Sequence, residues 1–156
     1  MTIPSNMTIS AVHTAYRSGV LTPTQLIEHL LTLCDAHASN PIWISRLTRA
    51  QLQPYLDALQ RHSPDTLALY GIPFAIKDNI DLAGVPTTAG CAEFAYTPAE
   101  DAFVVAQLIK AGAIPLGKTN MDQFATGLVG TRSPWGACTN SFNAAYIDRK
   151  STRLNS

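Results

Sequence analysis

Apolar residues in the first 63 positions recur at helical spacing. The stretch from Ile9 to Ser18 fits a short helix that ends at Gly19. Residues 22–25, Thr-Pro-Thr-Gln, have the form of a capping box with proline in the first turn. Behind this box, five positions fall on one apolar stripe of a second helix: Leu26, Ile27, Leu30, Leu31 and Cys34. The pattern predicts a helical hairpin.

The hairpin pattern stops at the Asn-Pro pair of residues 40–41, because proline lacks the N–H that a continuing helix needs. Residues 42–44, Ile-Trp-Ile, predict a short strand. Residues 48–61 predict a further helix, whose firmest part is expected after Pro54. Residues 64–69 predict a linker.

Beyond the linker, short apolar runs alternate with polar turns. The run that ends at Lys77 predicts a strand. Residues 97–100, Thr-Pro-Ala-Glu, have the form of a second capping box and predict a helix that continues to Gly112. Residues 113–117 predict a buried strand. Strand, helix and strand in this order favour a right-handed parallel crossover, so the predicted fold class is α/β.

One motif matches a phosphate-binding loop by spacing. Residues 112–119 contain two glycines followed by lysine and threonine. Such a loop follows a strand and surrounds the anion with backbone N–H groups, whereas this segment is itself strand-like, follows a predicted helix and contains Pro115. We therefore disfavour nucleotide binding. Residues 118–120 are expected to end the strand, and Thr119 with Asp122 to begin a short helix.

Composition and charge exclude several classes of protein. The 156 residues are 46% hydrophobic and 14% charged, enough apolar material for the core of one domain. Residues 1–147 hold eight basic and ten acidic residues, which offers no basic footprint for nucleic acid. No apolar stretch reaches the roughly 18 residues of a membrane span, and residues 1–6 lack a secretory pattern. We expect a cytoplasmic protein that binds neither nucleic acid nor membrane.

Cysteines and histidines show no metal or redox pattern. Cys34, Cys91 and Cys138 are widely spaced and form no Cys-x-x-Cys pair, so free thiols are expected. The four histidines all lie in the N-terminal helical part, without the convergence that metal ligands need: His13, His29, His37 and His62. We predict no metal site and no cofactor.

Lys77 is the candidate catalytic residue. It ends the apolar run 70–76, where an ammonium group loses hydration, and this lowers its pKa and favours the neutral amine that can accept a proton. A lysine at a strand end can instead reach solvent or pair with Asp78, and pairing would raise its pKa. The polar cluster after it consists of Asp78, Asn79 and Asp81. Asp and Asn are typical of turns, where their side chains hydrogen-bond to nearby backbone, and we favour this interpretation over one in which they tune the pKa of Lys77.

A longer pattern surrounds this lysine. Four runs occur in order: 71–81, 86–90, 99–105 and 111–124. Together they resemble the amidase signature family, over roughly residues 8 to 147. Within the family, the run 122–137 and the Asn-Pro-Ile-Trp-Ile of residues 40–44 are most similar to the allophanate hydrolase subgroup.

The resemblance implies part of the mixed-sheet amidase signature fold and an amide hydrolase with a triad of serine, cis-serine and lysine. Lys77 matches the lysine, which would take a proton through the bridging serine from the nucleophilic serine. The implied substrate is a small amide, allophanate, cleaved to ammonium and carbon dioxide in urea degradation, and the implied full-length enzyme is a homodimer without a cofactor. A general amidase, the amidase subunit of a transamidation complex, and a non-catalytic fragment remain alternatives.

The family pattern breaks after Ile147. The two Gly-Ser loops that would carry both serines do not follow, and Ser151 stands among charged residues where the family has glycines. We expect residues 1–147 to be the N-terminal portion of an amidase domain, helical over 1–63 and α/β over 64–147, with residues 148–156 foreign to it. A chain without both serines is expected to be inactive.

The loop 126–133 supplies the candidate substrate-binding residues Gly130, Thr131 and Arg132. Its glycines permit close approach of a ligand, and arginine can bind a carboxylate such as that of allophanate in a fork. An arginine that only holds the loop together is an equally open interpretation.

Overall fold

The computed structural model describes residues 3–4, 6–143 and 145–147, and the chain divides into two compact units. Of the described residues, the first unit comprises those within 3–36, 47–74 and 103–116, and the second comprises those within 37–46, 75–102 and 117–147. The tail 148–156, with Ser151, lies outside the described residues.

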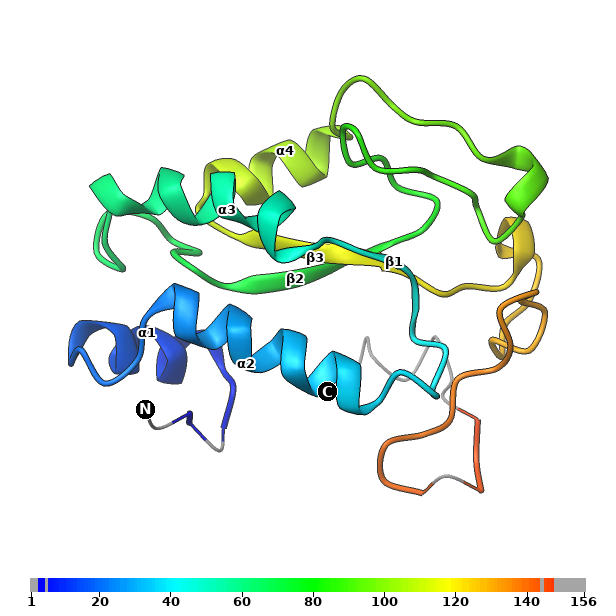
Figure 1. Ribbon diagram of the computed structural model, residues 1–156, viewed down its shortest axis with the longest axis horizontal. Helices are drawn as coiled ribbons and strands as arrows, with labels where there is room; N and C mark the ends of the chain where they lie inside the picture. Colours follow the sequence, from blue (N-terminus) through cyan, green and yellow to red (C-terminus); the bar gives the residue numbers. More distant parts are fainter. Residues whose placement is uncertain (1–2, 5, 144, 148–156) are drawn as a thin grey trace. The chain divides into compact units, whose positions relative to one another are not determined.

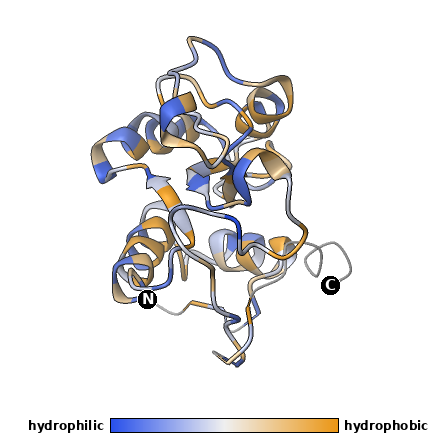
Figure 2. Cartoon of the chain, turned by 90° about the vertical axis from the view of Figure 1, so that its right-hand side faces the viewer, coloured by the Kyte–Doolittle hydropathy of each residue, from blue (hydrophilic) through white to orange (hydrophobic). Residues whose placement is uncertain are grey.

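Helices dominate the first unit (Figure 1). They are α1 (Ile9–Arg17), α2 (Pro23–Ala36), α3 (Arg49–Ala58), the 3₁₀ turn η1 (Leu59–Arg61) and α4 (Phe103–Lys110). Helical ribbons carry hydrophobic and hydrophilic positions side by side (Figure 2), as expected of helices with one buried side. No helix of the described ranges is long and apolar enough to cross a membrane.

The predicted hairpin of α1 and α2 is confirmed. The backbone N–H of Thr22 donates to the side chain of Gln25 at 2.9 Å, and the N–H of Gln25 donates to the Thr22 hydroxyl at 3.2 Å, which completes the capping box. Apolar side chains from both helices and their connection form one buried cluster: Val12, Tyr16, Leu21 and Leu26. Burial raises the pKa of Tyr16, whose hydroxyl donates to the Gly71 carbonyl at 2.9 Å.

Helix α3 corrects the prediction that the firmest helix follows Pro54. The helix begins at Arg49, with Thr48 and Gln51 in a complete capping box, and Pro54 lies inside it. Proline removes only the bond that its own N–H would donate one turn earlier, and the buried Leu52 and Leu56 hold the helix on both sides of that position.

The three strands are β1 (Trp43–Arg46), β2 (Pro73–Lys77) and β3 (Ile114–Thr119), in the sheet order β1-β3-β2. β1 and β3 are antiparallel, with Trp43 opposite Thr119, Ser45 opposite Lys118 and Arg46 opposite Gly117. The Ile114 N–H donates to the Ile72 carbonyl at 2.9 Å and the Asp78 N–H to the Thr119 carbonyl at 3.3 Å, so β2 and β3 run parallel. The predicted α/β class and all three predicted strands are confirmed, and residues 114–119 form a strand and not a loop.

Two predicted helix starts are wrong. Residues 97–100 form no helix, and α4 begins only at Phe103. The segment is tied instead to the turn after β2, because the Gly84 N–H donates to the Pro98 carbonyl at 2.9 Å and the Ala83 N–H to the Asp101 carboxylate at 2.7 Å. The short helix after β3 is the 3₁₀ turn η3 (Gln123–Ala125), and Asp122 makes no capping bond to it because its carboxylate is used elsewhere.

Gly117 lets β1 and β3 approach each other, and we predict that Gly117→Ala lowers the free energy of unfolding by about 2–3 kcal/mol. Its φ is +153°, and an added Cβ would lie 2.3 Å from the Ser45 carbonyl oxygen and 2.8 Å from the Arg46 Cα. Gly84→Ala is the matched control, because Gly84 also has a positive φ, +71°, but nothing lies within 4 Å of an added Cβ. Urea unfolding of both variants measures the difference, and equal losses would show that the contact with β1 does not matter.

Candidate active site

Lys77 is the last residue of β2 and is partly buried, next to the buried Ile76. The strand ends there because the following residues turn, with the Ile80 N–H bonded to the Lys77 carbonyl at 2.9 Å. The candidate base therefore lies at the carboxyl end of a strand, where parallel sheets commonly place functional groups.

Asp78 is fully buried directly after this lysine. Its Oδ2 accepts the N–H of Thr88 at 3.0 Å, the Thr88 hydroxyl, and the N–H of Gly90 at 3.4 Å. The carboxylate thus fixes residues 88–90 from the end of β2, which agrees with the interpretation of Asp78 as a residue that bonds to nearby backbone.

Lys118 on β3 is completely buried. Its Nζ donates to the Thr87 hydroxyl at 2.8 Å and lies 3.7 Å from Asp78 Oδ1, so both charges of this ion pair are removed from solvent. Burial lowers the pKa of Lys118, and the neighbouring carboxylates of Asp78 and Asp81 act against that change.

Asp81 extends the network toward the surface. It accepts hydrogen bonds from the hydroxyls of Thr87 and Tyr96, each at 2.8 Å. The bond to Asp81 raises the pKa of Tyr96. A continuous set of polar contacts therefore joins Lys118, Thr87, Asp81 and Tyr96 around the turn after Lys77.

Residues with left-handed backbone gather beside this turn. Ala89, Phe124 and Ala125 have φ of +51°, +49° and +57°, values that side-chain-bearing residues rarely adopt. The Phe124 N–H donates to the Ala89 carbonyl at 2.8 Å, and a Cβ on Gly90 would lie 3.0 Å from the Gln123 Cα. Backbone strain of this kind persists where surrounding contacts enforce it and is concentrated at functional sites.

The candidate substrate-binding residues lie on a loop held by Asp122, which is fully buried. Its Oδ2 accepts the Gly130 N–H at 2.9 Å and its Oδ1 accepts the Arg132 N–H at 2.7 Å. Thr131 and Arg132 are exposed, and Gly130 is partly buried. The backbone of this loop is thereby anchored while the Arg132 side chain stays accessible, and its role in binding remains a prediction.

We predict that Asp122→Asn loosens this loop, because a carboxylate accepts with two oxygens and an amide with only one. One of the two anchored N–H groups would then face an amide NH₂. Hydrogen exchange at the Gly130 and Arg132 amides is expected to accelerate about tenfold, corresponding to about 1–2 kcal/mol. Unchanged exchange at both amides, with the Leu52 amide in α3 as the internal reference, would contradict the anchoring role.

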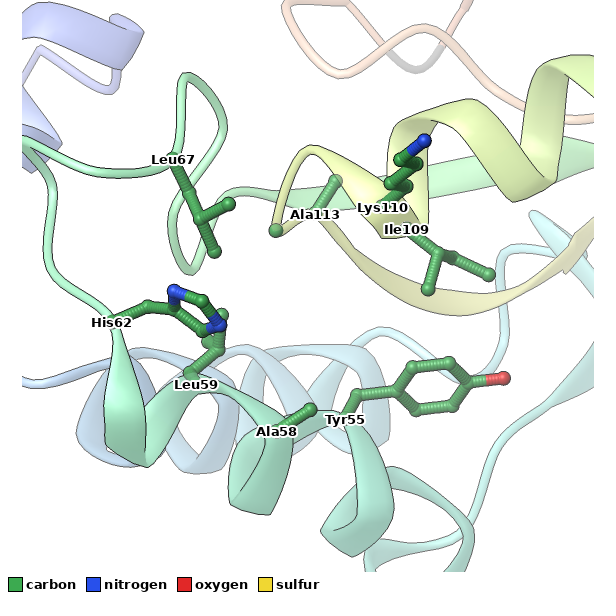
Figure 3. Close-up of a pocket in the computed structure, with 9 residues that line it drawn as sticks. Tyr55, Ala58, Leu59, His62, Leu67, Ile109, Lys110 and Ala113 are labelled. Atoms are coloured by element: carbon green, nitrogen blue, oxygen red, sulfur yellow. The ribbon is translucent and has the colours of Figure 1, made fainter.

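A separate pocket lies in the first unit (Figure 3) and has a volume of about 200 Å³. It is lined by Tyr55, Ala58, Leu59, His62, Leu67, Ile109, Lys110, Gly112 and Ala113. None of these residues belongs to the polar network after β2. Among the described residues no group of three or more His, Cys, Asp or Glu side chains could hold a metal ion.

The importance of Lys118 was not predicted. The predicted strand ended at Gly117, whereas β3 continues to Thr119 and carries Lys118 into the interior. A lysine directly after an apolar run was the available signal, and the same signal identified Lys77.

Comparison with known proteins places the chain in a family. The sequence model of the Amidase family matches residues 36–148, well over half of the chain. The chain belongs to the amidase family. This confirms the resemblance that the four sequence runs indicated, and Lys77 and Lys118 both lie within the matched amidase region.

Relatives of this amidase chain include a urea amidolyase, an allophanate hydrolase and an amidotransferase subunit. It is 48% identical over 124 residues to the urea amidolyase of Saccharomyces cerevisiae, covering 79% of this chain and 7% of that protein. A solved allophanate hydrolase from Kluyveromyces lactis aligns with a TM-score of 0.81 and 40% identity, covering 96% of this chain and 25% of that chain. A glutamyl-tRNA(Gln) amidotransferase subunit of Chloroflexus aggregans is 32% identical over 156 residues, covering 90% of this amidase chain and 30% of that protein. The amidase chain thus spans less than a third of each relative.

Proposed function

We propose that this chain is the amidase segment of an allophanate hydrolase that acts in urea degradation. The proposal is supported by the 40–48% identity to an allophanate hydrolase and a urea amidolyase, against 31–38% for glutamyl-tRNA(Gln) amidotransferase subunits that cover 76–92% of the chain. We further propose a cytoplasmic location and a homodimeric full-length enzyme, on the grounds of sequence composition and family resemblance.

In this proposal Lys77 is the general base. As a neutral amine it accepts a proton relayed by a bridging serine from the nucleophilic serine, whose oxygen attacks the amide carbon. The C–N bond then breaks, the amine leaves with the proton that Lys77 held, and water releases the acyl group from the serine. Lys77 lies at the end of β2, beside a turn fixed by Asp78, and this position supports the role because a base must be held in place.

The loop anchored by Asp122 is proposed to recognise the substrate carboxylate. Arg132 is exposed, and its backbone is bonded to Asp122 at 2.7 Å, which restricts where its guanidinium can reach. Gly130 and Thr131 precede it on the same loop and would line the approach of the ligand. A planar guanidinium matches a carboxylate with two parallel hydrogen bonds.

A chimaera tests the proposal. Residues 1–147 replace the matching segment of the Kluyveromyces lactis allophanate hydrolase, so that the host supplies the rest of the enzyme. Ammonium release is then compared for allophanate, glutamine and a simple aliphatic amide. We expect allophanate to be preferred by at least about a hundredfold in kcat/KM. A preference for glutamine would favour the amidotransferase function, and equal rates on all three would favour a general amidase.

A further inference from the structure

The proposed mechanism uses Lys77 and leaves the buried Lys118 without a role. Lys118 Nζ faces three oxygen atoms: the Thr87 hydroxyl at 2.8 Å, the Pro86 carbonyl at 3.5 Å and Asp78 Oδ1 at 3.7 Å. A lysine side chain is seldom fully buried unless its charge is paired with a partner.

The contacts around Lys118 favour its charged form. The Thr87 hydroxyl donates its only hydrogen to Asp81 at 2.8 Å, so toward Lys118 it can only accept. An ammonium has three N–H donors and no acceptor, which suits three surrounding oxygens, whereas the lone pair of a neutral amine would have no donor here. Burial disfavours this charge, but Asp78 and Asp81 support it.

Asp78 carries the matching negative charge. The N–H groups of Thr88 and Gly90 and the Thr88 hydroxyl all donate to its Oδ2, and donors of this kind favour a carboxylate. Its Oδ1 accepts no hydrogen bond from any residue that the structure describes, and Lys118 is the cation that faces it. This carboxylate immediately follows Lys77, where an uncompensated negative charge would hold the base as an ammonium.

We propose that Lys118 is a positioning residue for the base: it neutralises Asp78, so that this carboxylate can fix the turn after β2 without keeping Lys77 protonated. The inference rests on the proposed role of Lys77. The carboxylates that act on Lys118 are those of Asp78 and Asp81, both from the turn after β2. The role of Lys118 does not depend on which amide is the substrate.

Competitive acetylation of the 156-residue chain with acetic anhydride tests the inference without any substrate, because only neutral amines react. Mass spectrometry gives the labelling of Lys77 relative to the exposed Lys110 across a pH series, which separates the neutral fraction from accessibility. In Lys118→Met the neutral fraction of Lys77 is expected to fall about tenfold at mildly alkaline pH. In Asp78→Asn it is expected to rise, because Lys118 then repels the Lys77 ammonium.

The neutral fraction of Lys77 is thus expected to change in opposite directions in the two variants. A merely structural role would change it in the same direction in both. Near-ultraviolet circular dichroism establishes that each variant is folded. An unchanged neutral fraction of Lys77 in folded Lys118→Met would overturn the inference. If Lys118→Met does not fold, Asp78→Asn decides the question. A rise in the neutral fraction of Lys77 in that variant supports the inference, and no change or a fall overturns it. Because no hydrolysis is measured, the result is independent of whether allophanate is the substrate.

Discussion

Lys77→Met in the chimaera is expected to reduce kcat/KM for allophanate by about 10³-fold or more, because a positioned general base contributes about 10²–10⁴ and nucleophile activation depends on it. Methionine matches the lysine side chain as far as Cε, with sulfur at the δ position, and lacks the amine. Steady-state ammonium release gives the ratio, and Lys110→Met is the matched control because Lys110 is exposed at the end of α4.

Lys77→Arg separates a base from a fixed positive charge. A guanidinium keeps its proton at any pH that the enzyme tolerates, so this variant is expected to be as inactive as Lys77→Met. If Lys77→Arg keeps a kcat/KM within about tenfold of the parent chimaera, Lys77 acts only as a cation. The proton relay would then have to be abandoned.

Lys118→Met is expected to lower the free energy of unfolding by about 3–5 kcal/mol, because it leaves the buried carboxylate of Asp78 without its cation. The double variant Asp78→Asn with Lys118→Met removes both charges and is expected to recover most of that loss. Urea unfolding of the wild type, both single variants and the double variant completes the cycle. Additive losses would contradict coupling between two groups that lie 3.7 Å apart.

The same pair predicts a pH dependence of stability. Burial lowers the pKa of folded Lys118 below its ordinary value of 10.5. Between the lowered value and 10.5, the unfolded chain binds more protons than the folded chain, so the free energy of unfolding contributed by this group rises with pH. The free energy of unfolding of the wild type should therefore exceed that of Lys118→Met by a growing amount as pH rises through this alkaline window. A constant difference would contradict the effect of burial.

Sequence reasoning succeeded where the deciding contacts are local. The capping box at Thr22 and Gln25 needs only two residues three positions apart, and it forms as predicted. The box expected at residues 97–100 has equally suitable residues, yet no helix starts there, because the Pro98 carbonyl accepts the Gly84 N–H and the neighbouring Asp101 carboxylate accepts the Ala83 N–H, 18 residues away. Contacts of that sequence separation are not encoded in any local pattern.

The candidate site shows the same limit. Lys77 could be identified because it directly ends an apolar run and matches a family motif. The burial of Lys118 depends on Thr87, 31 residues away, and on Asp78, which the turn after β2 brings to the same place. Asp122 was expected to cap a helix, and only the folded loop shows its two oxygens bonded to Gly130 and Arg132.

The most direct test of the account is the rate at which the chimaera carrying residues 1–147 releases ammonium from allophanate. We expect a kcat/KM within about tenfold of the Kluyveromyces lactis parent, and background rates once Lys77 is replaced. A folded chimaera that leaves allophanate intact, or one that hydrolyses it equally well without Lys77, would contradict the proposed function.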